Sequence, residues 1–548
     1  VGRLARAKLS VRNWKDLENE IKHSDAVTFA PGTEIEIQLG YNQEFETVFD
    51  GLITELVGAF GPTGEPVLIV HCRCRGSLLT GIRRSRVFED KSDKDAVAEI
   101  AGAYGLDPEV GDGPTYPSMV MYDSADWDFL VARARALGWA LYVRGKRLVL
   151  GPAEASGSPV TELEWGATLL EVEVSQNPAE RAARVIATGW DPETLEPTTS
   201  EQPATASGFP EADRPSVDQA LKDAGWPERE TRHPRPTPLA ADELDGDTVA
   251  VVEGDALSHI SGRGRAIGLP QIRIDSLLEL KGLGTRFSGA HYVTAVRHLL
   301  STDGYFTEFQ LGRPPRLGSA EAGRRDHLVP PATDLAIGVV DDIDDQNGWG
   351  RVKVRLPWLD DAAAPIWARL VRPDAGPKRG FYFIPEVGDE VVIGFLGSDP
   401  RQPIVLGGLW NGQHAAPEQL DAATNPIRAI VSRSGHRVVL DDSDGAGKIT
   451  LKSAAGQTVV IDDSSGAEKI ELEDKTGNTL TLDSGGIALT AAAGADVAIA
   501  ASTGAIKLDA SEIQVTSTGP AAVKSSAALD LQAAATLGIS GAVVKINS

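Results

Sequence analysis

The 548-residue chain has few of the residues that disulfide-stabilised proteins and metal sites depend on. Its two cysteines, Cys72 and Cys74, both lie in the predicted strand VLIVHCRCR. Residues two apart in a strand point the same way and do not bond to each other, so we expect no disulfide framework and a reducing site of synthesis. Together with His71 they could suggest a metal site. We favour the interpretation that they are two small side chains on one face of a strand. We expect no metal and no cofactor.

Positive charge and long apolar runs are also scarce. Lys and Arg number 53 against 78 Asp and Glu, which gives a net charge of −25. Such a surface repels nucleic acid, so we expect no nucleic-acid partner. The sequence offers neither an apolar run of about 20 residues, as a membrane span requires, nor a signal peptide. The chain begins at Val1 rather than Met, and we expect that N-terminal residues are missing before it.

A regular repeat begins at Gly435, and Gly456 and Gly477 follow at equal intervals. Within the repeat, apolar residues lie two apart, which is the periodicity of strands. A short strand repeat cannot bury its own apolar face, so it must stack on neighbouring units or on other chains. We therefore predict an intertwined or stacked homo-oligomeric β-helix over residues 428–548. The residues predicted for its core are Val438, Leu440, Ile449, Leu451, Val459, Ile461, Ile470, Leu472, Leu480 and Leu482.

The rest of the tail keeps this rhythm with smaller residues. The apolar pairs that continue it are Ile487/Leu489, Val497/Ile499, Ile506/Leu508, Ile513/Val515, Leu529/Leu531, Leu537/Ile539 and Val544/Ile546. Ala, Ser, Thr and Gly dominate between them and would let three strands approach one axis, so we expect an intertwined β-helix that narrows toward its end. We predict that Val544, Ile546, Asn547 and Ser548 form a blunt docking surface for a separate tip protein. The acidic runs 441–444, 462–463 and 468–474 are predicted to face solvent.

The upstream chain reads as strands with a few helices. Predicted strands cover residues 7–11, 34–39, 48–57, 67–75, 139–150, 169–175, 182–189, 292–300 and 305–311, and predicted helices cover 93–104 and 124–137. The segment of about residues 190–240 is rich in Pro, Ser and Glu and is predicted to be an exposed excursion. Residues 333–412 form another β unit with dense turn signals.

The segment AIGVVDDIDDQNGWGRVKVRLPW, with FYFIPEVGDEVVIGFLGSDPRQPIVLGGLWNGQ after it, resembles the OB-fold domain of VgrG and phage baseplate spike proteins. The positions that match the family pattern are Gly350, Arg351, Val352, Val354, Pro357, Pro385, Val387, Gly388, Asp389, Glu390, Val391, Phe395, Asp399, Pro400, Pro403, Gly407 and Asn411.

The first part of the chain is similar to the hub of the same family. One matching stretch, MVMYDSADWDFLVARARALGWALYV, places Asp126, Phe129, Leu130, Arg133 and Gly138 where the family has them. A second stretch, FSGAHYVTAVRHLLSTDGYFTEFQLGR, matches at Gly289, Tyr292, Val293, Val296, His298, Gly304, Tyr305 and Phe309. The family's opening strands are absent or shortened here, and no lysozyme-like insert separates hub from OB domain.

The resemblance implies a mainly β protein of three parts. These are a hub over residues 1–326, built of β-barrel domains with a few helices, an OB-fold collar over 333–412, and the β-helical needle over 428–548. It implies the homotrimeric, non-enzymatic spike of a contractile injection system. Its expected partners are tube and baseplate proteins at the hub, a PAAR-type tip protein at the C-terminal end, and the target membrane. We expect assembly in the cytoplasm and delivery outside the cell. The alternative is a trimeric β-helical spike with glycan-degrading activity. Phage tail, type VI system and extracellular injector stay open.

Two segments of the chain partly match ligand-binding motifs. Residues 444–450 resemble a phosphate loop but lack its first Gly and its Ser or Thr, and they recur in the next repeat, so a turn is predicted. Residues 341–348 resemble a calcium loop, but the required spacing places Ile343 and Val354 at ligand positions. His259, His291 and His298 lack metal-like spacing, and we expect His298 to form structural hydrogen bonds. Asp128 and Glu89 are expected to be solvated or in salt bridges. We predict no catalytic residue.

Overall fold

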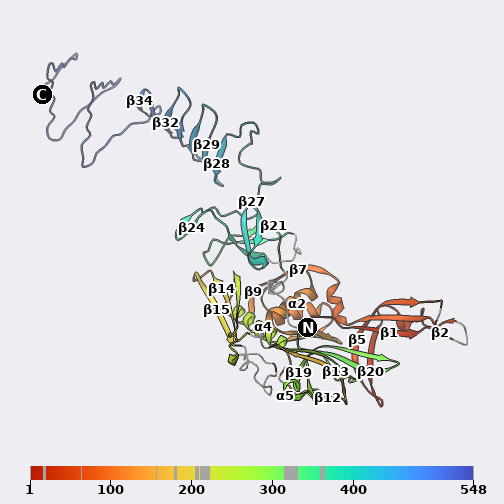
Figure 1. Cartoon of the computed structure of the whole chain (residues 1–548). Coiled ribbons are helices and arrows are strands. Elements are labelled where there is room, and N and C mark those ends of the chain that lie inside the picture. Colours follow the sequence, from red (N-terminus) through yellow and green to blue (C-terminus); the bar gives the residue numbers. More distant parts are fainter. Residues whose placement is uncertain are drawn as a thin grey trace. The chain divides into compact units, whose positions relative to one another are not determined.

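The computed structural model describes all residues except 1, 16–19, 63, 156, 178–181, 204–208, 210–221, 314–330, 358–364 and 547–548. The chain forms two compact units, Val1–His414 and Ala415–Ser548. The first unit holds the predicted hub and OB domain, and the second holds the repeat (Figure 1). No helix in the part of the chain that the structure describes is long and apolar enough to cross a membrane.

The hub contains two sheets that share a four-stranded antiparallel arrangement. The first runs β1-β6-β5-β4, with strands β1 (Arg6–Arg12), β4 (Glu34–Tyr41), β5 (Glu44–Ala59) and β6 (Val67–Arg73). The second runs β12-β18-β19-β20-β17-β13, with β12 (Thr161–Glu164), β13 (Leu169–Gln176), β17 (Ile260–Ile267), β18 (Ser276–Lys281), β19 (Gly289–Ser301) and β20 (Gly304–Leu311). Its inner part, β17-β20-β19-β18, repeats the first sheet strand for strand. In both sheets the long strand, β5 or β19, shifts register against the last strand, β6 or β20.

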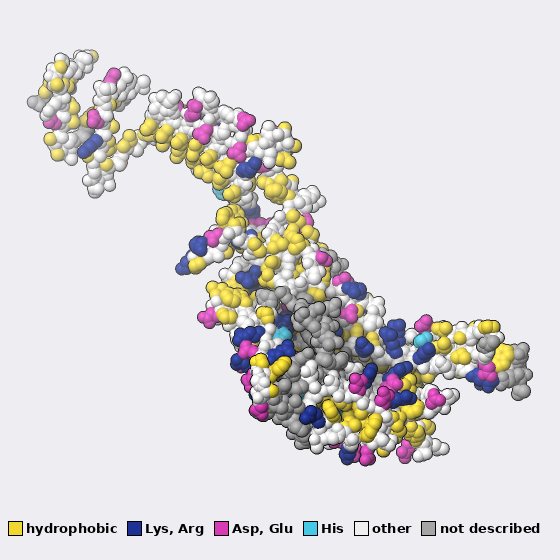
Figure 2. Space-filling model, viewed as in Figure 1, with side chains coloured by type: hydrophobic (Ala, Val, Ile, Leu, Met, Phe, Trp, Pro, Cys, Tyr) yellow, Lys and Arg dark blue, Asp and Glu magenta, His cyan; other side chains and the backbone are white. Residues whose placement is uncertain are grey.

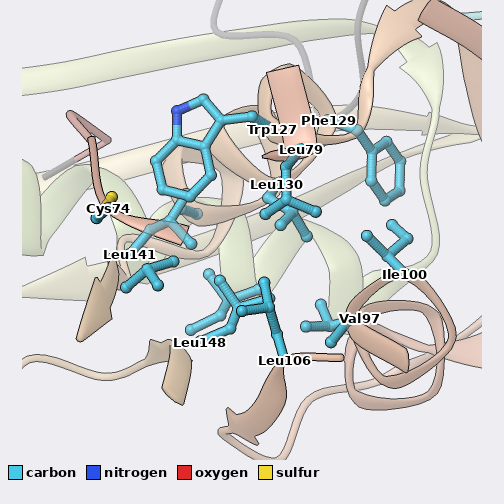
Figure 3. Packing of buried hydrophobic residues seen from close by; sticks show 14 of the residues in the cluster. Cys74, Leu79, Val97, Ile100, Leu106, Trp127, Phe129, Leu130, Leu141 and Leu148 are labelled. Atoms are coloured by element: carbon cyan, nitrogen blue, oxygen red, sulfur yellow. The ribbon is translucent and has the colours of Figure 1, made fainter. Parts of the chain in front are cut away.

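Two helices close the core beside the first sheet. α1 (Asp93–Gly102) starts at Ser92, which forms a capping box with Asp95, and α2 (Asp126–Leu137) ends at Gly138. The hub core gathers side chains from both helices and from the neighbouring hairpin, including Val97, Ile100, Leu130 and Leu148 (Figure 3). Both cysteines lie in this core as free thiols, and burial raises their pKa.

Seven further strands belong to the first half of the hub. They are β2 (Trp14–Lys15), β3 (Glu20–Ile21), β7 (Arg83–Ser92), β8 (Asp107–Val110), β9 (Thr115–Ala125), β10 (Ala140–Arg144) and β11 (Arg147–Gly151). The single strand predicted over 139–150 is wrong, because β10 and β11 form a hairpin that turns at Gly145, where φ is +56°. A four-residue helix, α5 (Gly284–Phe287), precedes β19.

The predicted excursion at about 190–240 has its own structure. β15 (Glu196–Pro203) and β16 (Glu230–Pro238) flank β14 (Arg184–Asp191) in a three-stranded sheet. The segment is thus more than an irregular excursion, since it contains these two strands, but most residues of β15 are exposed. Residues 204–208 and 210–221 lie outside the described residues. The helix that follows, α4 (Ala241–His259), was not predicted at all.

The OB domain is a closed barrel in the order β21-β22-β23-β27-β26. Its strands are β21 (Ala336–Asp342), β22 (Val352–Arg355), β23 (Ile366–Leu370), β26 (Glu390–Phe395) and β27 (Pro403–Gly408), with a small hairpin of β24 (Ala375–Gly376) and β25 (Arg379–Gly380). Val352, Val354, Val391 and Ile393 fill its interior, as the alternation in the sequence predicts. Val120 of β9 belongs to the same apolar cluster, so the barrel packs on the hub.

The second unit is a seven-stranded antiparallel meander, β28 to β34 in sequence order. Its strands are β28 (Ile427–Val431), β29 (Arg437–Asp441), β30 (Lys448–Lys452), β31 (Thr458–Asp462), β32 (Lys469–Glu473), β33 (Thr479–Asp483) and β34 (Gly486–Thr490). The strands predicted from Val497 onward do not form within one chain, since described residues 491–546 contain no strand. Small side chains there bury almost nothing, and strands need a partner for their backbone groups.

Candidate functional site

The ten residues predicted for the needle core meet on one face of the meander in two cross-strand rows. One row pairs Val438, Leu451, Val459, Leu472 and Leu480 in succession, and it continues to Ile430 at one end and Leu489 at the other. The second row pairs Leu440, Ile449, Ile461, Ile470 and Leu482, and it continues to Ile487. We call these two rows the apolar face. Directly opposed aliphatic side chains stabilise a sheet, but they still leave one side of each row uncovered.

A single chain leaves the apolar face open. Leu440, Ile449, Leu451, Ile461, Ile470 and Leu472 keep between 38% and 46% of their surface exposed. Hydrophobic side chains line one side of the repeat in Figure 2, whereas acidic side chains lie on the other. A continuous exposed apolar surface of this kind marks an interaction site.

The opposite face carries a row of alternating charge. Asp441, Lys448, Asp462, Lys469 and Asp483 oppose one another on successive strands. Asp462 accepts a hydrogen bond from Lys448 Nζ at 2.9 Å and from the Ser464 backbone at 2.9 Å. Hydrogen bonds from Ser464 and Lys448 lower its pKa to about 2. The prediction that the acidic runs face solvent is wrong for Asp462, which is 7% exposed, because its lysine partner comes from the neighbouring strand.

Aspartates also set the turns of the repeat. Asp441, Asp474 and Asp483 each accept a hydrogen bond from a backbone N–H two residues further on, which is the Asx-turn pattern. The phosphate-like segment 444–450 includes the turn between β29 and β30, where Gly445 has φ +66°. This agrees with its interpretation as a turn.

The predicted docking residues lie at the far end of the second unit. Val544 is 48% exposed and Ile546 is 77% exposed. Asn547 and Ser548 lie outside the described residues. The role of these four residues stays a prediction.

The calcium-like loop of the barrel is closed by an arginine. Both carboxylate oxygens of Asp345 accept hydrogen bonds, from the Trp349 and Arg351 backbone N–H groups at 3.0 Å and from Arg351 Nη2 at 2.7 Å. Burial would raise the pKa of Asp345, but the bonds from Arg351 outweigh it and lower the pKa to about 2. The Arg351 guanidinium also lies 5.2 Å from the ring centres of Trp349 and Trp367. These contacts satisfy the hydrogen-bonding capacity of the carboxylate without a calcium ion.

The predicted histidine and carboxylate candidates have structural contacts. His298 Nδ1 lies 2.9 Å from Tyr305 Oη and 3.2 Å from Thr307 Oγ1, as expected for a hydrogen-bonding role. Glu89 lies 3.6 Å from Lys353 Nζ, and Asp128 is exposed on α2. Among the residues that the structure describes, no three His, Cys, Asp or Glu side chains are placed to hold a metal ion.

One hub cavity of about 390 Å³ is lined by several carboxylates. Glu46 accepts a hydrogen bond from Arg273 Nη2 at 2.8 Å. Asp275 accepts one from Tyr292 Oη at 2.6 Å and one from the Glu154 backbone at 2.9 Å. Burial raises the pKa of Tyr292, which keeps this phenol a donor. Glu46 and Asp275 therefore hold hub segments together.

Three family descriptions match the chain in order. Residues 1–302 match the Alg8 N-terminal domain, residues 336–410 match the type VI secretion system and phage-baseplate injector OB domain, and residues 448–506 match the phage baseplate V C-terminal trimerisation domain. The last range contains eight of the ten predicted core residues, from Ile449 to Leu482.

Known relatives match parts of the chain. The type VI secretion system spike protein VgrG3 of Vibrio cholerae is 32% identical over 19% of this chain and 11% of the relative. VgrG1b of Pseudomonas aeruginosa is 25% identical over 37% of this chain and 31% of the relative. The chain thus spans less than a third of the length of these two relatives. A chain of the Francisella PdpA–VgrG complex shares the fold, with a TM-score of 0.51 at 9% identity, covering 89% of this chain and 76% of that one.

A hub with two related sheets, an injector OB barrel and a trimerisation repeat together define a hub-spike protein of the VgrG and phage baseplate V class. Within this class the chain belongs to the family of the Alg8 N-terminal domain, whose description covers more than half of it.

Proposed function

We propose that the chain is the structural spike of a contractile injection system and works as a homotrimer. The apolar face carries this proposal. Most of it lies in the segment matched by a trimerisation domain, and one chain leaves it exposed. Three copies would bury these rows against one another around a common axis, and the alternating charges of the opposite face would stay toward solvent.

The two related hub sheets support a role as an adaptor. Each chain carries the four-stranded order twice, as β1-β6-β5-β4 and as β17-β20-β19-β18. Three chains would therefore present six equivalent sheets in a ring. Such a ring can meet a sixfold tube on one side and continue into a threefold needle on the other. Tube and baseplate proteins are the partners that this ring would bind.

The action proposed is mechanical. The spike would transmit the contraction of a sheath to the target membrane, with a PAAR-type tip protein on its C-terminal end. It would be assembled in the cytoplasm and delivered outside the cell on contraction. We propose no catalytic step, because the carboxylates of the hub cavity hold structural hydrogen bonds.

A charge placed on the apolar face tests the trimer. Ile461→Asp would bury a carboxylate at the same level in all three copies, at a cost of several kcal/mol each. The variant should lose the trimeric mass of the full-length protein in light scattering. Thr450→Asp is the matched control, since Thr450 points to the opposite face, between Lys448 and Lys452. A monomeric parent protein, or equal masses for both variants, would contradict the proposal.

A further inference from the structure

The OB barrel touches the hub at a second place besides the contact with Val120. The loop between β26 and β27 lies against the end of β16 and the first turn of α4. Gln402 Nε2 donates a hydrogen bond to the Pro238 carbonyl at 3.3 Å. A side chain at Gly397, where φ is +60°, would meet Thr237 Cγ2 at 2.6 Å. The Thr237 side chain therefore packs against the Gly397 backbone where a Cβ would not fit.

Arg401 crosses this contact with a buried guanidinium. Its Nε lies 3.1 Å from both oxygens of Asp399, and its Nη2 lies 2.9 Å from one of them. Its remaining Nη1 lies 3.3 Å from both oxygens of Glu243 in the first turn of α4. The Arg401 side chain is only 5% exposed. Asp399 thus orients the arginine from the barrel side, and Glu243 receives it on the hub side.

The hub side of this contact continues into a second buried ion pair. Arg133 of α2 donates to Asp93 of α1 at 2.6 and 2.9 Å, and its guanidinium lies 4.6 Å from the ring centre of Tyr116. Tyr116, Arg133 and Glu243 line one small cavity. Burial raises the pKa of Glu243, whereas Arg401 and Arg133 lower it. Charges of opposite sign thus alternate from α1 to the barrel.

Buried ion pairs differ from apolar contacts in what they contribute. Their attraction is largely offset by desolvation, so they add little net stability, but a misaligned pair leaves a charge buried and unpaired. The contact therefore favours one orientation of the barrel on the hub, because other orientations would leave a charge buried and unpaired. At the base of the same loop, Tyr122 of β9 and Phe395 of β26 lie 6.3 Å apart between ring centres. The barrel is thus held on the hub by apolar contacts and by the buried Arg401–Glu243 pair, with Glu89 and Lys353 as a more exposed ion pair.

We propose that Arg401 is a latch that fixes the orientation of the OB barrel on the hub. Its receptor is Glu243, and Asp399 is a positioning residue that aims the guanidinium. With the latch closed, the barrel cannot pivot on its apolar contact. A load applied to the hub therefore passes directly into the collar, a consequence that rests on the proposed function.

Hydrogen–deuterium exchange of the full-length protein tests the latch. Arg401→Met keeps the length of the side chain and removes the charge. It should raise amide exchange at least about tenfold in residues 396–402 and in the first turn of α4. Glu243→Gln should raise exchange at the same two places by a smaller factor. Arg379→Met removes an exposed arginine on the same barrel, which pairs with Asp374 at 3.0 Å, and should leave both places unchanged.

The possible results of this experiment distinguish the proposed latch from the proposed spike function. Parent-like exchange at both places in Arg401→Met overturns the latch, whatever the oligomeric state. If Arg401→Met does not fold, Glu243→Gln decides, and unchanged exchange in that variant overturns the proposal. Raised exchange at only one of the two places also overturns it, because a latch must loosen both of its sides. A monomeric parent that still shows the paired response keeps the latch and removes the proposed function.

Discussion

One half-buried histidine, His298, makes the hub sensitive to mild acid. Burial lowers the pKa of His298 to about 4, and the charge of Arg273 acts in the same direction. The unfolded chain takes up a proton near pH 6.5 but the folded hub does not. Stability is therefore present above that pH and is lost as the pH falls toward about 4. For this partly exposed group we expect a loss of about 2 kcal/mol over that range.

His298→Gln tests this pH dependence. The parent hub should melt at a clearly lower temperature near pH 5 than near pH 7, and the variant should show a smaller difference, because glutamine does not titrate. His414→Gln, at an exposed position on the barrel, should behave like the parent. The same pH-dependent drop in all three proteins would show that His298 is not the group responsible.

At the scale of the element, the end of α2 depends on a glycine for two reasons. Gly138 has φ +69°, and a Cβ there would lie 2.8 Å from the Ala250 Cα of α4. Gly138→Ala should therefore combine backbone strain with a clash against backbone, and destabilise the hub by about 2–3 kcal/mol. Calorimetry of the first unfolding transition in the full-length protein measures this.

Gly102→Ala is the control for that substitution. Gly102 ends α1, and nothing lies within 4 Å of the Cβ it lacks. Alanine should stabilise this helix by about 0.5–1 kcal/mol, so the two melting temperatures should shift in opposite directions. Shifts of the same sign and size would mean that the close approach of α2 and α4 does not constrain the hub.

Elements were predictable where one physical signal dominates. α1 carries its cap and its apolar face in adjacent residues, and the alternating pairs of the repeat place their strands. α4 was missed because Gly246 and Gly254 interrupt it, and because Asp247, Thr248 and His259 share its buried face with leucines. No apolar stripe marks such a helix, because its buried face includes polar side chains such as Asp247, which pairs with Arg235 of β16.

In the candidate site, too, some features follow from the sequence pattern and others depend on which strands pair. Alternation alone placed the ten core residues on one face, but it could not say which strands pair. Ile430 was missed because Arg428, two residues before it, stands where the second row would continue on β28. No apolar pair therefore marks that strand. The burial of Asp462 depends on Lys448, which only the hairpin brings opposite to it.

At the scale of the whole molecule, the repeated sheet of the hub could not be predicted. The two copies share strand order and the position of a register shift, but no sequence pattern connects β1 with β17. β17 also follows an insertion that contains α4 and three strands. Topology reveals a repetition of this kind only after the strands are paired.

The last prediction concerns the end of the second unit, where three chain ends would meet in the proposed trimer. Val544 and Ile546 continue the alternation of the repeat and are exposed in one chain. With both replaced by serine, the full-length protein should bind a purified PAAR-repeat protein at least about tenfold more weakly, because up to six aliphatic side chains leave the contact. Trimer mass should not change, since the apolar face is intact. Val543→Ser is the matched control, as Val543 is exposed to a similar degree but falls out of step with the alternation. Equal affinity of both variants in calorimetric titration would place the docking surface elsewhere on the chain.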